Sequence, residues 1–279
     1  IEASITPSTK AILPVHLFGC PVDMDKLMSI ARKYKLKVIE DCAQACGATW
    51  NKKPLGSWGD IGCFSFFPTK NLGAAGDGGA VTTRDPDLAQ RVRELSIHGM
   101  PRRYFHTQLG YNSRLDALQA AILNVKLPKL DNWVSRRRDI SCGYIDLLKD
   151  CKDLQLPNQL KSQHSIHAWN QFVVKIQPPH NKLPNKLEGS QDGTSCNTRD
   201  WIKNKLEEKG VSTIIYYPIP IHLQPAYKEL GYEVGSLPVT EELCTNVLSL
   251  PIFPELTEQQ QYYVVDKIHE TIREVKEGK

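Results

Sequence analysis

A single lysine stands between an aromatic run and a glycine-rich run in this sequence. Residues 64–79 read FSFFPTKNLGAAGDGG, with Lys70 near the centre. Glycines let the backbone approach another group closely, so the amine of Lys70 can lie in a partly desolvated pocket. Desolvation lowers the pKa of a lysine, and the neutral amine can form a Schiff base with a carbonyl compound. A lysine that extends from a loop into solvent is the alternative at this point.

An acidic pair ends the apolar run KVIED (37–41), which we expect to be a buried strand. Ligands of open α/β sheets bind at the C-terminal ends of strands. A carboxylate such as Asp41 can hold a cationic ring nitrogen there, which the pyridinium of pyridoxal phosphate requires to act as an electron sink. A strand-end aspartate is more often a cap of the next turn. Because Lys70 follows one strand later, the two residues together suggest a cofactor site.

A hydroxyl and several glycines flank the same lysine. Ser65 can offer its hydroxyl to a phosphate, and the backbone N–H groups of GAAGDGG (73–79) can bind an anion, although these glycines can also be turn residues. The spacing matches neither the dinucleotide fingerprint nor the P-loop. Cys42 and Cys46 form a C-x3-C pair without a second pair at finger spacing, so we predict no metal site.

Apolar runs alternate with a helical pattern from residue 10 to residue 83. This alternation predicts an α/β layer with a mixed, mainly parallel sheet flanked by helices. The expected strands lie in AILPVHLFG (11–19), KVIED (37–41), IGCFSFF (61–67) and GAVTT (79–83). Asp85 and Pro86 are typical of the N-cap and first residue of a helix, which we expect to cover the sheet.

The second half of the chain predicts a smaller α+β domain. An amphipathic helix with Leu115, Leu118, Ile122 and Val125 is interrupted at Pro128, and a second long helix links two domains. We expect strands in 168–176 and 211–218 and helices near 199–209 and after Thr240 and Thr257. Residues 178–198 are expected to form an exposed loop. The large domain is assigned to residues 1–135 and the C-terminal domain, with the interdomain helix, to 136–279.

The composition limits the partners and the cellular location that we expect for the protein. The net charge of +4 arises from 35 basic and 31 acidic residues that are interspersed, so we expect no nucleic-acid partner. No apolar run reaches the roughly 18 to 20 residues that span a bilayer, and no signal-peptide layout opens the chain. The eight scattered cysteines fit reduced thiols. We predict a soluble, cytoplasmic protein without a membrane partner.

The sequence resembles the DegT/DnrJ/EryC/StrS family of PLP-dependent nucleotide-sugar aminotransferases, a branch of the fold-type I aminotransferases. The matching stretches follow the family order along nearly the whole chain: PVHLFG (14–19), EDCAQA (40–45), FSFFPTKNLGAAGDGGAVTT (64–83), HG (98–99), LGYNSRLDALQAAIL (109–123), YYPIPIHLQPAY (216–227) and LSLPIFPELT (248–257). The resemblance implies a fold-type I PLP-transferase large domain, incomplete at its N-terminus, with a smaller α+β domain.

The resemblance also implies roles for single residues. Lys70 is similar to the lysine that bonds the aldehyde of pyridoxal 5'-phosphate, Asp41 to the partner of its pyridine nitrogen, and Gln44 to the residue beside its ring hydroxyl. Ser65 resembles a phosphate ligand. Asn112 resembles an asparagine that reaches the cofactor phosphate of the neighbouring subunit, which implies a homodimer with shared active sites.

The implied substrates are a nucleotide-diphosphate keto-sugar and an amino-acid donor, glutamate in most relatives. The nucleotide-sugar contacts are implied at Arg114, Tyr216, Tyr217 and His222, although tyrosines before proline are also common packing residues. HLQPAY (222–227) resembles members that aminate C3 of the sugar rather than C4. A dehydratase is disfavoured because that branch replaces the lysine with histidine.

Two departures from the family are visible. Cys46 stands where many relatives have histidine, and relatives carry a further segment before the position of Ile1, including a helix N-terminus that binds the cofactor phosphate. We therefore expect a family member without its N-terminal part. The alternative function is a non-catalytic or truncated homologue that keeps the fold but binds the cofactor poorly.

Overall fold

A computed structural model describes residues 1–158, 160, 164–177 and 197–277. The chain forms two compact units, and each is described by itself: Ile1–Arg138 with Leu160–Asn170, and Asp139–Gln159 with Gln171–Lys279. The sequence placed the division between residues 135 and 136, whereas the units divide after Arg138, inside helix α4 (Leu130–Leu148). The loop expected at 178–198 lies outside the described residues except for its last two.

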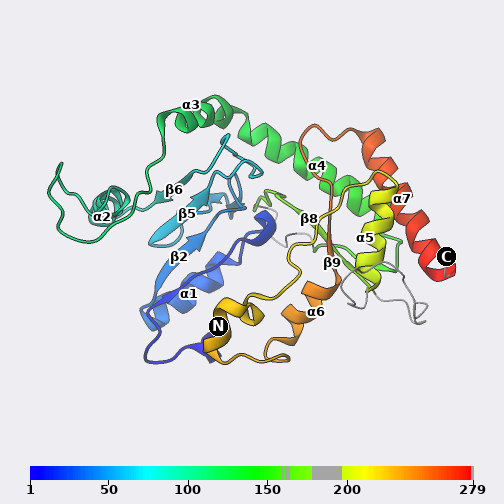
Figure 1. The fold of residues 1–279 in the computed structure, drawn as a ribbon, viewed down its shortest axis with the longest axis horizontal. Helices are drawn as coiled ribbons and strands as arrows, with labels where there is room; N and C mark the ends of the chain where they lie inside the picture. Colours follow the sequence, from blue (N-terminus) through cyan, green and yellow to red (C-terminus); the bar gives the residue numbers. More distant parts are fainter. Residues whose placement is uncertain (159, 161–163, 178–196, 278–279) are drawn as a thin grey trace. The chain divides into compact units, whose positions relative to one another are not determined.

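The first unit contains a four-stranded sheet in the order β1-β2-β5-β6 (Figure 1). Strands β1 (Ala11–Ile12), β2 (Lys37–Asp41) and β5 (Ile61–Ser65) are parallel, and β6 (Gly79–Thr82) pairs antiparallel with β5. The prediction of a mixed, mainly parallel sheet is confirmed. A short hairpin of β3 (Thr49–Trp50) and β4 (Lys53–Pro54) lies between β2 and β5 in the chain. The C-terminal ends of β2 and β5 therefore lie at one edge of the sheet.

Helix α1 (Met24–Tyr34) connects β1 to β2 and supplies the core beside them (Figure 1). The Asp23 side chain caps its N-terminus by accepting a hydrogen bond from the Lys26 backbone N–H. Its apolar face buries Met24 and Leu27, and each such side chain contributes about 1.5 to 3 kcal/mol of burial free energy. Val38 of β2 belongs to the same core cluster. This packing fixes the strand that ends at the acidic pair.

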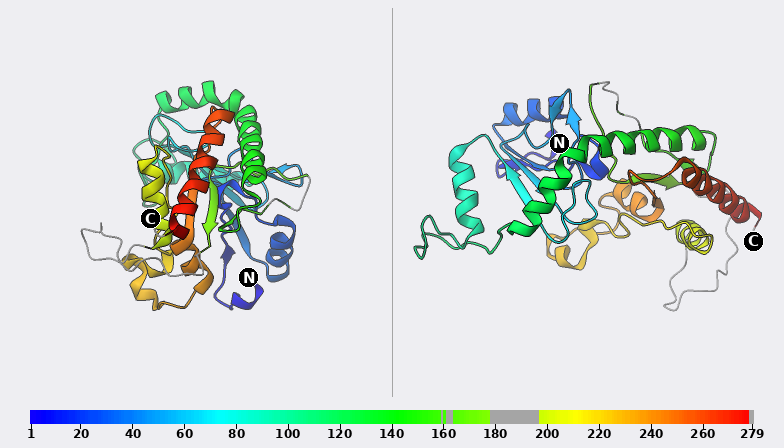
Figure 2. Two further views of the ribbon diagram at one scale, coloured as in Figure 1. Left: turned by 90° about the vertical axis from the view of Figure 1, so that its right-hand side faces the viewer. Right: turned by 90° about the horizontal axis from the view of Figure 1, so that it is seen from above.

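Two helices follow the sheet. Helix α2 (Pro86–Ser96) begins at the expected cap, since Asp85 accepts hydrogen bonds from two backbone N–H groups of the first turn. The expectation that α2 covers the sheet is wrong, because none of its residues is buried and it lies beside β6 (Figure 1). Helix α3 (Ala117–Lys126) runs through η3 (Leu127–Lys129) into α4, and the bend at η3 is visible in Figure 2.

The second unit is built on an antiparallel sheet of β7 (Leu154–Gln155), β8 (Phe172–Ile176) and β9 (Val247–Leu250). Its helices are α5 (Thr198–Glu208), α6 (Pro238–Asn246) and α7 (Glu258–Glu277), with two 3-10 turns, η4 (Ile221–Leu223) and η5 (Pro225–Leu230). Buried residues of its core include Tyr144, Leu148, Phe172, Leu206, Leu248 and Ile268.

The strand expected over 211–218 is wrong. The segment forms one isolated bridge, in which Ile214 and Ser249 exchange two backbone hydrogen bonds of 3.3 and 2.8 Å. Pro218 and Pro220 follow, and proline has no N–H to donate to a ladder. Among the described residues, no helix is both long and apolar enough to span a bilayer.

Candidate active site

A cavity of about 200 Å³ opens at the C-terminal ends of β2 and β5. It is lined by Leu13, Ile39, Glu40, Asp41, Ala43, Cys63, Phe64 and Ser65. Because β2 and β5 are adjacent and parallel, the residues that end them share one edge. The sequence-predicted residues Asp41 and Ser65 are therefore brought together at this cavity. Sequence reasoning missed Leu13, Ala43 and Cys63; Leu13 and Ala43 could have been found as residues just beyond strand ends, whereas Cys63 lies in the middle of β5.

Asp41 is held firmly at the cavity. Its backbone N–H donates to the Pro14 carbonyl at 2.9 Å, and its own carbonyl accepts from the His16 N–H at 3.1 Å. Carboxylate atom Oδ1 accepts a hydrogen bond of 2.9 Å from the Ala43 N–H, so the residue does cap the following turn. No described side chain or backbone group donates to Oδ2. Asp41 thus caps the turn with one oxygen and can offer the other to a ligand.

The neighbouring Glu40 is buried and accepts hydrogen bonds from within the protein. Its side chain is fully buried, and Oε1 accepts from the Trp58 and Gly59 N–H groups, both at 2.8 Å. Oε2 accepts from the Gly56 N–H at 2.8 Å and from His16 Nε2 at 3.3 Å. Burial raises the pKa of Glu40, but the bonds from His16 and the three backbone groups outweigh it and lower the pKa overall.

The His16 ring is oriented by a second bond, since Nδ1 accepts from the Val22 N–H at 3.2 Å. Its proton is therefore on Nε2, facing Glu40. His16, Glu40 and Cys42 are the described group whose ligand atoms lie close enough to hold a metal ion. Both oxygens of Glu40 are already occupied by hydrogen bonds, so this cluster fits a structural role in fixing β2 and the turn at 56–59.

Lys70 lies half-buried in the loop that follows β5. Its backbone N–H closes a turn to the Phe67 carbonyl at 2.9 Å. Burial lowers the pKa of the amine, and the negative charge of Asp41 opposes that change. The amine is therefore partly desolvated and within electrostatic reach of the cavity carboxylate.

The glycines after Lys70 let the loop fold on itself. The Phe66 N–H donates to the Gly78 carbonyl at 2.7 Å, and the Ala74 N–H donates to the Phe66 carbonyl at 2.8 Å. A Cβ atom at Gly73 would lie only 2.4 Å from the carbonyl oxygen of Pro68. Gly73 is thus required by close backbone approach within the loop, which is the turn interpretation of these residues.

Helix α3 holds the same loop from one side. Lys126 Nζ donates to the Gly73 carbonyl at 2.6 Å, and the Ala75 N–H donates to Gln119 Oε1 at 2.8 Å. Helix α3 follows Lys70 by many residues in the chain, and these contacts show that it helps to fix the loop that carries Lys70.

Gln44 and Ser65 are each oriented by a backbone N–H group. The Phe18 N–H donates to Gln44 Oε1 at 2.6 Å, and the Phe67 N–H donates to Ser65 Oγ at 3.3 Å. Phe18 belongs to the 3-10 turn η2 (Leu17–Gly19), which follows β1. The side chain of Gln44 is thus tied to the turn that passes the end of the sheet.

Neither Lys70 nor Gln44 is among the residues that line the cavity, and the remaining predicted residues lie farther along the chain. Asn112 and Arg114 are exposed on the segment between α2 and α3, where Arg114 Nη2 donates to Asn112 Oδ1 at 3.4 Å, and neither lines the cavity. Tyr216, Tyr217 and His222 belong to the second unit. His222 is buried, and its Nε2 lies 3.1 Å from Glu241 Oε1.

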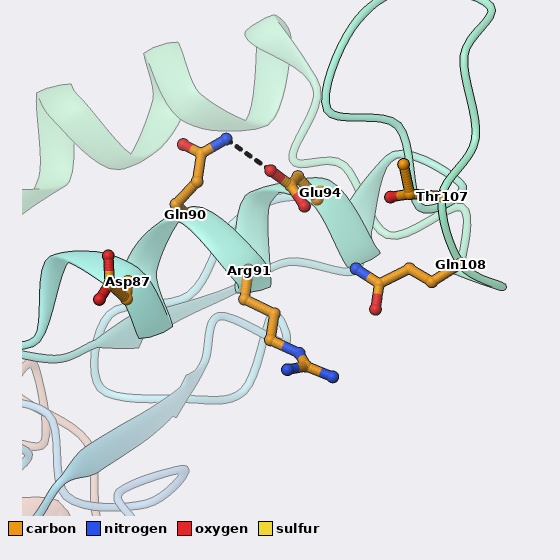
Figure 3. Close-up of a pocket in the computed structure, with 6 residues that line it drawn as sticks. All are labelled: Asp87, Gln90, Arg91, Glu94, Thr107 and Gln108. Carbon is orange, nitrogen blue, oxygen red and sulfur yellow. Dashed lines mark hydrogen bonds between the residues drawn. The ribbon is translucent and has the colours of Figure 1, made fainter.

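A second hollow of about 400 Å³ lies beside α2 (Figure 3). It is lined by Asp87, Gln90, Arg91, Glu94, Thr107 and Gln108, and contains none of the sequence-predicted residues. Gln90 and Glu94 hydrogen-bond to each other at 2.9 Å, and the charges lining the hollow are of both signs. This polar helix surface offers no convergent chemistry, so the cavity at β2 and β5 is the candidate active site.

Comparison with known proteins identifies the family of the chain. The model of the DegT/DnrJ/EryC1/StrS aminotransferase family matches residues 1–269. A curated relative from Acidithiobacillus ferrooxidans, a UDP-N-acetyl-3-dehydro-alpha-D-glucosamine 3-aminotransferase, is 45% identical over 272 residues that cover 98% of this chain and 67% of the relative.

Two solved structures share the fold. DesV of S. venezuelae superposes with a TM-score of 0.85 at 39% identity, covering 96% of this chain and 67% of DesV. NtdA of Bacillus subtilis, solved with bound cofactor PMP, superposes with a TM-score of 0.80 at 34% identity, covering 98% of this chain and 59% of NtdA. The chain thus spans about two thirds or less of the length of these proteins.

Proposed function

Because this chain belongs to the DegT/DnrJ/EryC1/StrS aminotransferase family, we propose that it is a sugar aminotransferase that uses pyridoxal 5'-phosphate. It moves an amino group from an amino acid, glutamate by our expectation, to a nucleotide-linked keto-sugar. The observation that carries the proposal is the placement of a partly desolvated lysine, Lys70, within electrostatic reach of Asp41 at the end of β2.

The residues at the cavity fit the cofactor. Asp41 has an oxygen that receives no described hydrogen bond, Ala43 is small enough to leave room, and Ser65 places a hydroxyl on the lining. We assign Asp41 to the pyridine nitrogen, Gln44 to the ring hydroxyl, Ser65 to the phosphate and Lys70 to the aldehyde. When bound, the cofactor withdraws electrons from the bond that breaks at the amino-bearing carbon.

Lys70 and Asp41 have complementary tasks. Since burial lowers the pKa of Lys70, a larger fraction of the amine is neutral and can bond the cofactor or accept a proton. Lys70 then acts as general base and acid at the reacting carbon. Asp41, as a carboxylate, would stabilise a positive charge on the ring nitrogen of the cofactor.

The substrate assignment rests on the relatives. The Acidithiobacillus protein is named for a 3-amino transfer to a UDP-sugar, which favours C3 of the sugar here. We assign Arg114 to a phosphate or sugar carboxylate, because its guanidinium can make forked bonds, and Tyr216, Tyr217 and His222 to the sugar nucleotide. A homologue that keeps the fold but binds the cofactor poorly is not favoured, since the relative carries an aminotransferase name.

A homodimer with shared active sites is part of the proposal. Asn112 does not line the cavity of its own chain, and α3 exposes apolar side chains, with Leu118 78% and Val125 70% exposed. Exposed apolar side chains on one helix fit an interface with a second copy. We infer that Asn112 serves the cofactor phosphate of the partner subunit.

The decisive experiment is borohydride reduction of the protein mixed with pyridoxal phosphate, followed by peptide mass mapping. We expect a pyridoxyl group on Lys70, which Lys70→Ala removes and which the exposed-lysine control Lys129→Ala leaves in place. An adduct concentrated on another lysine would contradict the assignment. Parallel assays with 3-keto and 4-keto nucleotide sugars then test the position, and faster turnover of the 4-keto compound would overturn C3.

A further inference from the structure

The residue after Lys70 is an asparagine whose side chain points into the protein. Asn71 is 6% exposed, and its Nδ2 donates to the Ala168 carbonyl at 2.7 Å. Its Oδ1 accepts from Nδ2 of Asn170, itself 4% exposed, at 3.1 Å. Both ends of the Asn71 amide are thus bonded to one segment, which lies far from Lys70 in the sequence but belongs to the same unit.

That segment is bonded in turn to the η2 turn. The Asn170 N–H donates to the Phe18 carbonyl, and the Ala168 N–H donates to the Gly19 carbonyl, both at 2.9 Å. The N–H of the same Phe18 donates to Gln44 Oε1 at 2.6 Å. A continuous path of hydrogen bonds therefore joins Asn71 to Gln44 through Asn170 and Phe18.

The turn at the middle of this path has little freedom to change. Gly19 has φ +89, and a Cβ atom there would lie 2.9 Å from the Gln44 carbonyl oxygen and 3.0 Å from the Trp169 nitrogen. Only glycine adopts this backbone conformation at such close approach without strain. The carbonyl groups of the turn, which accept from the segment at 168–170, and the Phe18 N–H, which donates to Gln44, are therefore held in fixed directions.

We propose that Asn71 is a positioning residue for Lys70, and that Asn170 and the η2 turn support it so that Lys70 and Gln44 keep one arrangement relative to each other. The inference rests on the proposed function, in which both residues contact the cofactor. Its physical basis is the planar peptide bond between Lys70 and Asn71, which carries the orientation of residue 71 to the backbone of Lys70. A buried amide with both ends bonded has few alternative orientations.

The first test needs no cofactor. Competitive acetylation of the full chain across a pH series, read by peptide mass, reports the protonation of the Lys70 amine. In Asn71→Ala we expect Lys70 to titrate at higher pH than in wild type, because a loosened loop admits water and relieves the desolvation that lowers its pKa. Asp41 is the charged group that raises the pKa of this amine; loosening the loop weakens that attraction too, but desolvation is the larger of the two effects, so its relief sets the direction of the shift.

The second test measures the rate at which pyridoxal phosphate bonds to Lys70. We expect Asn71→Ala, which removes both hydrogen bonds of the side-chain amide, to slow the reaction about tenfold. Asn170→Ala should act in the same direction with a smaller effect, since the bond from Asn71 to Ala168 remains. The double variant should resemble Asn71→Ala, because the two residues act through one network.

Gln261→Ala is the matched control. Gln261 is buried, and its Nε2 donates to the Ile140 carbonyl at 2.6 Å in the other unit, so its loss removes a similar bond without touching the lysine loop. If the Asn71 and Asn170 variants lower the melting temperature as Gln261→Ala does, yet leave the Lys70 titration and bonding rate unchanged, the positioning role is wrong. If Asn71→Ala fails to fold, Asn170→Ala decides alone.

The two proposals fail in different ways. A wild-type protein that bonds no pyridoxal phosphate at Lys70 contradicts the proposed function, whereas the acetylation series still tests whether Asn71 sets the environment of the amine. A wild type that bonds the cofactor normally, with variants indistinguishable from it, contradicts only the positioning role.

Discussion

Replacing Glu40 with glutamine should destabilise the first unit strongly, although the change is nearly isosteric. The four groups that face the carboxylate are all donors: three backbone N–H groups and His16 Nε2. Whichever way the new amide turns, its NH2 meets two of these donors and accepts from neither. Two bonds to a charged group are lost in a buried site, which predicts a loss of about 3 to 5 kcal/mol in the free energy of unfolding.

The histidine cannot rescue the variant by changing tautomer. His16 Nδ1 accepts from the Val22 N–H, so moving the proton to Nδ1 would break that bond to save the other. The cost is a large part of the roughly 5 to 15 kcal/mol that stabilises a typical domain. Urea unfolding, followed by tryptophan fluorescence, measures this cost, because four of the five tryptophans (Trp50, Trp58, Trp133 and Trp169) belong to the first unit.

The pH dependence gives an independent check. Folding lowers the pKa of Glu40 below its ordinary value of 4.5, so its stabilisation is fully present above that value and is lost as pH falls through the folded pKa. The difference between wild type and Glu40→Gln should therefore be largest near neutral pH and shrink below 4.5. The exposed Glu255→Gln should stay within about 0.5 kcal/mol of wild type. A Glu40→Gln variant equally close to wild type at pH 7 would refute the reasoning.

Three further outcomes are expected. Asp41→Asn should keep its bond to Ala43 and fold normally but lose most transamination with glutamate, because a neutral amide does not hold the ring nitrogen protonated; near-normal turnover would contradict this. Gly73→Ala should lower the free energy of unfolding by about 1 to 3 kcal/mol, since its Cβ would meet the Pro68 carbonyl at 2.4 Å, and an unchanged urea midpoint would argue against it. Arg114→Ala should raise the KM for the sugar nucleotide far more than for the amino donor in steady-state kinetics.

The sheet and its functional edge could be predicted because their signals are local. Apolar runs of strand length, the helical spacing of Met24 and Leu27, and the cap at Asp85 each depend on a few neighbouring residues. Once β2 and β5 are parallel neighbours, the position of Asp41 at a ligand-binding edge follows from the general rule for open sheets.

The different roles of Glu40 and Asp41 could not be predicted from such local signals. Adjacent residues of a strand point to opposite faces, but the sequence does not say which face carries the turn at 56–59 that donates to Glu40. The incorrect prediction of a strand over 211–218 has a similar cause. Its β-branched residues favour extended backbone, yet whether a ladder forms depends on a partner strand distant in the chain.

The support of Lys70 shows the same limit at the site itself. Lys70 can be recognised in the sequence because glycines and aromatic residues surround it within a few positions. The role of Asn71 depends instead on its hydrogen bond with Asn170, which follows it by 99 residues. A buried amide in a loop sequence looks like any polar loop residue until its partner is known. Local sequence therefore identifies the group that does chemistry, and the long-range contacts identify what keeps it in place, so substitutions that separate these two effects have to be chosen from the structure.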